Sequence, residues 1–153
     1  MITENKLRHS LAVAEKAREL AESLIPNSNI DKPAMLDAIF ITGLLHDVGY
    51  DKLSTDDSPS THPAIGARML QHFLQYQYTA ARAIKEHGHS ACDNLISYVL
   101  NAADLSVDSH GNPVDMDLRV LDIYRKYPGS AHADSAMKQL EAVKHADTKQ
   151  FRI

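Results

Sequence analysis

The sequence is poor in the residues that stabilise small disulfide-linked proteins. Its 153 residues include one cysteine, Cys92, and no tryptophan. A single thiol excludes an intrachain disulfide and a metal site built from several thiolates. We therefore interpret Cys92 as a small core or near-surface residue, which is the usual role of a free cysteine.

Long apolar runs are also missing. No stretch approaches the roughly 20 apolar residues that a membrane-spanning helix needs. Residues 1–6 (Met-Ile-Thr-Glu-Asn-Lys) lack the apolar segment of a signal peptide. These absences predict a cytoplasmic protein without a membrane partner.

An excess of positive charge is absent as well. Sixteen Lys and Arg residues stand against 20 Asp and Glu, which gives a formal net charge of -4. A nucleic-acid polymer is therefore not expected as a partner, because binding its phosphates needs clustered basic residues. Small phosphorylated substrates stay open, since a bound cation could reverse the local sign of charge.

The sequence does contain nine histidines beside those 20 acidic residues. Imidazole and carboxylate groups are ligands that suit first-row transition metals. The hydrophobic and charged fractions, 44% and 24%, are those of a globular protein. The length predicts one domain over residues 1–153.

Apolar residues recur at intervals near 3.6 along most of the chain, and no segment alternates as a strand does. Thr3 and Asp31 are placed to cap the first two helices, and Gly49 is expected to end the second. Residues 51–61 lack periodicity and predict a surface loop before a helix that begins at His62. The pattern predicts an all-α, single-domain bundle of about six to seven helices, with the others near residues 4–25, 79–87, 93–105, 115–127 and 131–146.

The strongest local signal is the adjacent pair His46-Asp47 at the end of an apolar helix. Burying an imidazole and a carboxylate costs roughly several kcal/mol unless the groups are paired or bound to a metal. A metal ion could use both side chains at once. The alternative is an ordinary helix terminus, in which the histidine bonds a backbone carbonyl.

Further residues favour the metal. His9, His62, His87 and Asp104 each occupy an inward-facing or helix-end position on a different predicted helix. Helical bundles build metal sites from side chains on facing helices in this way. Taken singly, each histidine is more often an ordinary, partly buried residue. The histidines expected at the surface are His72, His110, His132 and His145.

The order His … His-Asp … Asp resembles the signature of the HD superfamily of metal-dependent phosphohydrolases. In this chain it reads His9, then His46-Asp47 inside residues 43–49 (Gly-Leu-Leu-His-Asp-Val-Gly), then Asp104. The resemblance implies an HD-type helical bundle. It also implies an enzyme that hydrolyses a phosphate ester or anhydride, with a metal-bound hydroxide as nucleophile.

The resemblance covers residues 7–105 and is strongest to small binuclear members such as the diadenosine tetraphosphate hydrolases. The absence of a Gly-Tyr-Pro element argues against the cyclic-dinucleotide phosphodiesterases of the superfamily. His62 and His87 lie in segments similar to the binuclear members and would hold a second metal, with Asp47 bridging. By the same resemblance, the ligands of the first metal would be His9, His46, Asp47 and Asp104.

The implied cofactors are one or two divalent ions of Fe, Mn, Co, Ni or Zn. Such an ion lowers the pKa of a bound water molecule and neutralises charge on the phosphoryl group. Asp47 could orient the attacking water. Lys52, close to the His-Asp pair, is the candidate for a catalytic and substrate-binding cation, and weaker substrate-binding candidates are Arg8, Arg68, Arg82 and Lys85.

Two other functions stay open. Di-iron oxygenases of the HD type use a similar ligand set, and some HD-like modules bind a nucleotide without turnover. The expected substrate is a nucleotide or a dinucleoside polyphosphate, and a homodimer stays open. His89, two positions after His87, could serve as an alternative ligand or a proton donor.

Overall fold

The computed structural model describes residues 3–54, 56, 61–74, 78–88 and 92–151. Within these ranges the chain forms seven α-helices, two short 3-10 helices and no strand, which confirms the predicted all-α fold. The 3-10 helices are η1 (Val48–Lys52) and η3 (Thr148–Gln150). The α-helices are α1 (Glu4–Leu24), α2 (Lys32–Leu45), α3 (His62–Leu74), α4 (Tyr78–Glu86), α5 (Leu95–Leu105), α6 (Met116–Lys126) and α7 (Ala131–His145).

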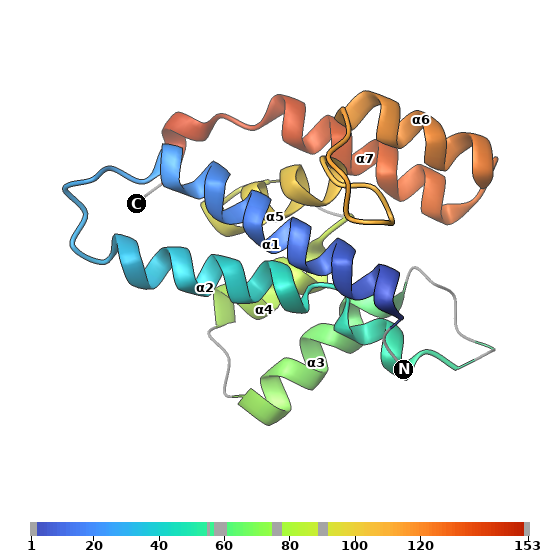
Figure 1. Cartoon of the computed structure of the whole chain (residues 1–153), viewed down its shortest axis with the longest axis horizontal. Coiled ribbons are helices and arrows are strands. Elements are labelled where there is room, and N and C mark those ends of the chain that lie inside the picture. Colours follow the sequence, from blue (N-terminus) through green and yellow to red (C-terminus); the bar gives the residue numbers. More distant parts are fainter. Residues whose placement is uncertain (1–2, 55, 57–60, 75–77, 89–91, 152–153) are drawn as a thin grey trace.

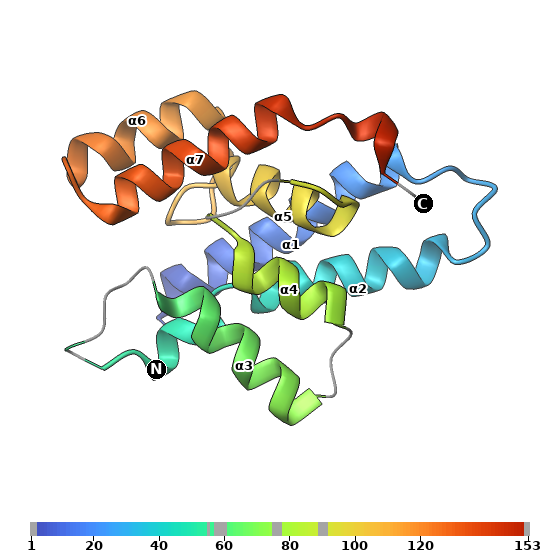
Figure 2. The ribbon, with the colours of Figure 1, turned by 180° about the vertical axis from the view of Figure 1, so that it is seen from behind.

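The helices form three groups (Figure 1). Helices α1 and α2 run antiparallel, and α5 packs against α1. Helices α3 and α4 form a hairpin on one side of this group, and α6 and α7 form a second hairpin on the other side (Figures 1 and 2). Helix α5 contacts both α4 and α7, so it lies at the centre of the arrangement.

Helix α5 contributes to three hydrophobic clusters, two of which are the larger ones. One of its faces joins side chains of α1, α2 and α4, with Val13, Ile39, Ile84 and Val99 among the buried residues. Leu105 at its end belongs instead to the core between α6 and α7. The end of α5 is therefore fixed by packing from both sides, which positions any functional side chain located there.

Small residues bring α1 and α2 close together. Ala14, Ala17 and Ala21 recur along the inner face of α1 and are almost completely buried. Opposite them, a Cβ atom on Gly43 would lie 2.7 Å from the Cα atom of Ala14. Thr3 caps α1 as expected, since its side chain accepts a hydrogen bond from the backbone of Lys6.

Two expectations about the second helix are wrong. Asp31 precedes α2, but its side chain makes no capping hydrogen bond, and its backbone is already helical (φ -89°, ψ 0°). The helix ends at Leu45, before Gly49, because the chain turns at His46 and Asp47 and continues as η1. Residues 51 and 52, expected in a loop, belong to η1.

Cys92 is buried, as expected, and burial raises the pKa of its thiol to about 11. No helix in the described part of the chain combines the length and the apolar character needed to cross a membrane.

Candidate metal centre

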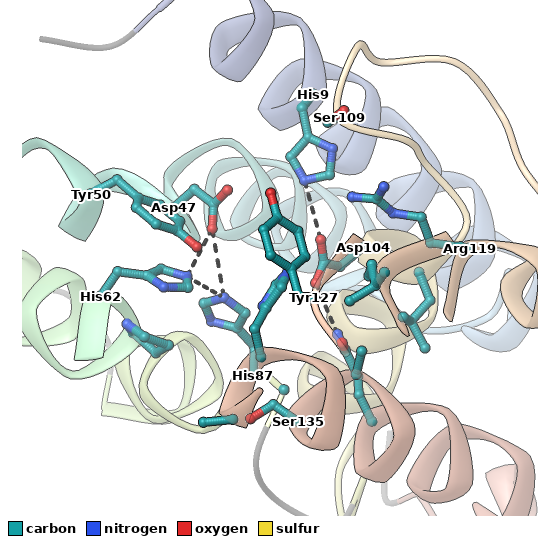
Figure 3. Close-up of a pocket in the computed structure, with 18 of the residues that line it drawn as sticks. His9, Asp47, Tyr50, His62, His87, Asp104, Ser109, Arg119, Tyr127 and Ser135 are labelled. Atoms are coloured by element: carbon teal, nitrogen blue, oxygen red, sulfur yellow. Dashed lines mark hydrogen bonds and ion pairs between the residues drawn. The ribbon is translucent and has the colours of Figure 1, made fainter. Parts of the chain in front are cut away.

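The side chains of the predicted ligand set converge on one place in the fold (Figure 3). Most of them stand at helix ends, where the chain can aim a side chain away from its own helix. His46 and Asp47 follow α2, His62 begins α3, His87 follows α4, and Asp104 lies near the end of α5. Only His9 belongs to the body of a helix, on the buried side of α1.

Asp47 is shared by three imidazoles. Its Oδ1 atom lies 3.0 Å from Nε2 of His62, 3.4 Å from Nε2 of His46 and 3.7 Å from Nε2 of His87. The Nε2 atoms of His62 and His87 are themselves 3.1 Å apart. This arrangement is that of a carboxylate between two groups of nitrogen ligands.

Asp104 occupies the other end of the cluster. Its Oδ1 atom lies 3.2 Å from Nε2 of His9 and 3.6 Å from Nε2 of His46. Candidate ligand atoms fall into overlapping groups whose members all lie within 4.8 Å of one another. These groups are His9, His46 and Asp47; His46, His87 and Asp104; and Asp47, His62 and His87.

Backbone carbonyls fix the orientation of the imidazoles. The Nδ1 atom of His9 lies 2.8 Å from the carbonyl oxygen of Asp108, and Nδ1 of His46 lies 2.7 Å from that of Gly43. Nδ1 of His87 lies 2.6 Å from the carbonyl oxygen of Ile84. Each Nδ1–H therefore donates outward, which directs the Nε2 atom of each ring into the cluster, as metal-binding histidines require.

His46 gives the most direct test of fit to a metal. Its side chain is fully buried, and its Nε2 atom has no hydrogen-bond partner among the described residues. That atom faces the carboxylates of Asp47 and Asp104, which can only accept. In the neutral ring, Nε2 would turn a lone pair toward these oxygens, and a cation between the three groups would remove that mismatch, so the donor set fits a metal ion.

The charges of the cluster also favour a bound cation. Burial opposes charge on His46, but Asp47 and Asp104 outweigh it and raise the pKa of this histidine to about 9. Burial likewise opposes charge on Asp47, yet His46 and His62 hold its pKa well below the usual value. Asp104 behaves in the same way beside His46 and His9. The two half-buried carboxylates are thus ionised and favour positive charge between them.

A glutamine outside the predicted set contacts the cluster. Gln139, buried on α7, donates a hydrogen bond of 2.9 Å from Nε2 to Oδ2 of Asp104. Asn101 on α5 accepts a bond of 2.9 Å at Oδ1 from the backbone N–H of Gly88, which follows His87. Two candidate ligands, Asp104 and His87, are therefore positioned by neutral side chains that the sequence did not indicate.

A pocket of about 580 Å³ opens beside the cluster. Lys6 and Arg119 line it and supply the positive charges that an anionic substrate would need. The ammonium group of Lys6 lies 3.6 Å from the centre of the Tyr50 ring, and Tyr50 stacks on His62 with ring centres 3.8 Å apart. Tyr127 lines the pocket from the side of α6 and α7.

The cations proposed from the sequence lie elsewhere. Their side chains are exposed or half-buried, and none of them lines the pocket that the described residues form. Their part in catalysis or in substrate binding stays a prediction. These residues are Lys52, Arg8, Arg68, Arg82 and Lys85.

The remaining histidines divide into three cases. His110 and His145 are exposed, as expected. His132 is exposed as well, but it lines the pocket. His89 and the side chain of His72 lie outside the described residues.

Comparison with known proteins supports the resemblance to the HD superfamily. The family model named HD domain matches residues 7–124. Proteins named Ribonuclease Y are similar to this chain over 101 residues, at 31% identity in Wolinella succinogenes and 27% in Streptococcus sanguinis. Each match covers 66% of this chain and 17% of the relative.

The chain therefore spans about a sixth of the length of these relatives. No solved structure matches. The similar proteins do not include a diadenosine tetraphosphate hydrolase by name, so closeness to that group stays a prediction.

Proposed function

The chain belongs to the HD domain family, and from that membership we propose that it is a metal-dependent phosphohydrolase acting on a small phosphate ester or anhydride. The observation that carries the proposal is the buried Nε2 atom of His46, which faces Asp47 and Asp104 without a hydrogen-bond partner in the described part of the chain. Between two carboxylates such an atom carries a proton or binds a cation, and a metal ion can take the place of the proton.

We propose two metal positions. When bound, the ions would supply the Lewis acidity that activates water and offsets charge on the phosphoryl group. Asp47 would be shared, because its Oδ1 atom faces imidazoles on both sides. The first position would be formed by His9, His46, Asp47 and Asp104, and the second by Asp47, His62 and His87.

The protein's own groups would bind and orient the substrate. Lys6 and Arg119 line the pocket and can pair with phosphate oxygens. Asp47 is ionised and can accept a hydrogen bond from the attacking water molecule. A nucleotide or a dinucleoside polyphosphate is the substrate class we propose, since the cavity has the size of small-molecule sites, roughly 300–1,000 Å³.

The names of the similar proteins suggest one more substrate for the assay. Their printed name, Ribonuclease Y, describes enzymes that act on RNA. Because this chain matches only 17% of their length, RNA cleavage is a substrate to include in an assay. It is not our proposal for this chain.

The test is the variant Asp47→Ala. Removing the shared carboxylate is expected to abolish phosphate release and to remove bound metal while the helices stay folded. Phosphate release would be measured on a panel of nucleoside monophosphates, dinucleoside polyphosphates and a short RNA. Metal content would be measured by plasma mass spectrometry, and helix content by circular dichroism.

His145→Ala is the matched control, because His145 is an exposed histidine at the end of α7. It is expected to keep both activity and metal. His62→Ala should lose one of two metal equivalents. Full activity in Asp47→Ala would contradict the proposal, and oxygen consumption without phosphate release would favour an oxygenase.

A further inference from the structure

The pocket extends past the ligand cluster to a wall formed by α6, α7 and the turn between them. We propose that this α6–α7 wall binds the aromatic ring of the substrate's leaving group, and that Arg119 pairs with the substrate's phosphate. This inference rests on the proposed function and narrows the substrate to a phosphate monoester of a ring-bearing alcohol, of which a nucleoside monophosphate is the model. The wall consists of Arg119, Ile123, Tyr127, Ala131, His132 and Ala136.

Arg119 is the cation that the α6–α7 wall contributes. Its side chain is only 15% exposed, and Asp122 lies 4.0 Å away, at the limit of an ion pair. Asp122 is 46% exposed and also accepts a bond of 2.8 Å from Lys126. The guanidinium group therefore retains donors for an incoming anion, and its planar fork suits two phosphate oxygens.

The direction of Arg119 supports this role. Figure 3 shows its guanidinium group on the side of the pocket where His9 and Asp104 lie. Tyr50 lies on the other side of the pocket, next to His62 (Figure 3), and Lys6 lines the pocket with its ammonium group 3.6 Å from the centre of the Tyr50 ring. A phosphate held at the ligand cluster would therefore meet positive charge on both sides.

Tyr127 supplies the ring surface. It is 53% exposed and lines the pocket, so its ring is accessible to a ligand there. Its ring and that of His132 meet edge to face at 76°, with centres 5.4 Å apart. Such a pair covers at most one face of either ring, so a third ring can stack there.

The surroundings of these rings suit a flat, partly polar group. Ile123 and Ala136 are buried residues that line the same pocket and add apolar surface to it. Although His132 is exposed overall, partial desolvation of its ring at the pocket, together with nearby Arg119, lowers its pKa, and Asp104 opposes the shift. A neutral imidazole can exchange hydrogen bonds with the edge of a heterocycle without adding charge.

The experiment compares two substrates that differ in the ring alone. The metal-loaded chain would be assayed with adenosine 5′-monophosphate and with ribose 5-phosphate. Stacking on an aromatic side chain predicts a kcat/KM about tenfold or more higher for the nucleotide. Tyr127→Ala should remove that preference through KM, and Tyr127→Phe, which keeps the ring, should retain it.

Arg119→Gln should raise KM for both substrates about tenfold, because both carry the phosphate. The matched controls are Tyr124→Ala and Arg125→Gln. Both residues are exposed on α6, and neither lines the pocket. The control variants should behave as the unaltered chain does.

The outcomes separate this proposal from the proposed function. Equal kcat/KM for adenosine 5′-monophosphate and ribose 5-phosphate would contradict the ring subsite, and so would equal effects of Tyr127→Ala and Tyr124→Ala. Neither result would contradict the proposed phosphohydrolase activity. Binding of adenosine 5′-monophosphate can also be measured by calorimetry. Binding that depends on Tyr127, without phosphate release, would support the subsite and contradict the proposed function. Preferential cleavage of RNA over the nucleotide would contradict the proposal that the substrate is a phosphate monoester.

Discussion

At the scale of single residues, Asp104 shows how a candidate metal ligand is held in place. Its Oδ1 atom faces His9 and His46, while its Oδ2 atom accepts the hydrogen bond from Gln139. Both oxygens are therefore engaged, and the carboxylate has little freedom to rotate. Contacts of this kind commonly decide how tightly a metal site binds.

We predict that Gln139→Leu weakens metal binding without unfolding the chain. Leucine has a similar volume, but it cannot donate to Asp104, so the carboxylate loses its fixed orientation. The affinity for Mn²⁺, measured by calorimetry, is expected to fall about 10- to 100-fold. Gln150→Leu is the control, because Gln150 is exposed and bonds Asp147, away from the pocket. An unchanged affinity in Gln139→Leu would show that Asp104 needs no such support.

The sequence identifies ligands more readily than their neighbours. The His46-Asp47 pair stands out because two polar residues interrupt an apolar pattern. Lys6 could have been found, since it lies three positions before His9 and so shares a face of α1. Arg119 and Gln139 carry no such signal, because their place depends on how α6 and α7 pack.

At the scale of elements, the contact between η1 and α3 positions the second group of ligands. A Cβ atom on Gly49 would lie 1.9 Å from the carbonyl oxygen of His62 and 2.7 Å from the backbone nitrogen of Gly66. Only glycine permits this approach. Gly49 therefore brings the first turn of α3, and with it His62, against the His46-Asp47 turn.

We predict that Gly49→Ala displaces α3 and weakens the metal site. The added methyl group forces the backbones apart, which is expected to cost about 1–3 kcal/mol or more in unfolding free energy. Urea unfolding would measure this loss, and metal titration would measure the affinity.

Gly129→Ala is the control for this substitution. Gly129 has φ +67° but no atom within 4 Å of the added Cβ. It should lose about 1 kcal/mol from backbone strain alone and keep the metal affinity. Equal metal affinities in the two variants would contradict the role of Gly49.

The elements themselves were largely predictable, because helices follow local periodicity. The expected helix near residues 4–25 is α1, and that near 131–146 is α7, each within a residue of the expected end. The position of Gly49 did not predict where α2 ends. The helix ends at Leu45, and Gly49 instead allows η1 to pack closely against α3. Terminal positions generally depend on such contacts.

At the scale of the whole molecule, the candidate ligands come from distant parts of the chain. His9 lies on α1, Asp47 follows α2, and Asp104 lies on α5. A cation bound by all of them can bind only the folded chain. Metal binding at this site would therefore be linked to folding.

We predict that Mn²⁺ raises the melting temperature of the chain. At a free concentration about 100 times the Kd, binding adds roughly 2.7 kcal/mol, which corresponds to about 5–10 °C for a domain of this size. Differential scanning fluorimetry with Mn²⁺ and with a chelator would measure the shift. Asp47→Ala should abolish it, and an equal shift in that variant would place the ion elsewhere.

The sequence by itself determined the all-α class, the approximate helices and the residues with ligand chemistry, because periodicity and residue type are local properties. The tertiary structure alone decided which polar groups share a pocket. It placed Arg119 and Tyr127 beside the ligand cluster and kept Lys52 away from the pocket. Their positions depend on how helices distant in the sequence pack together, and no local pattern records that packing.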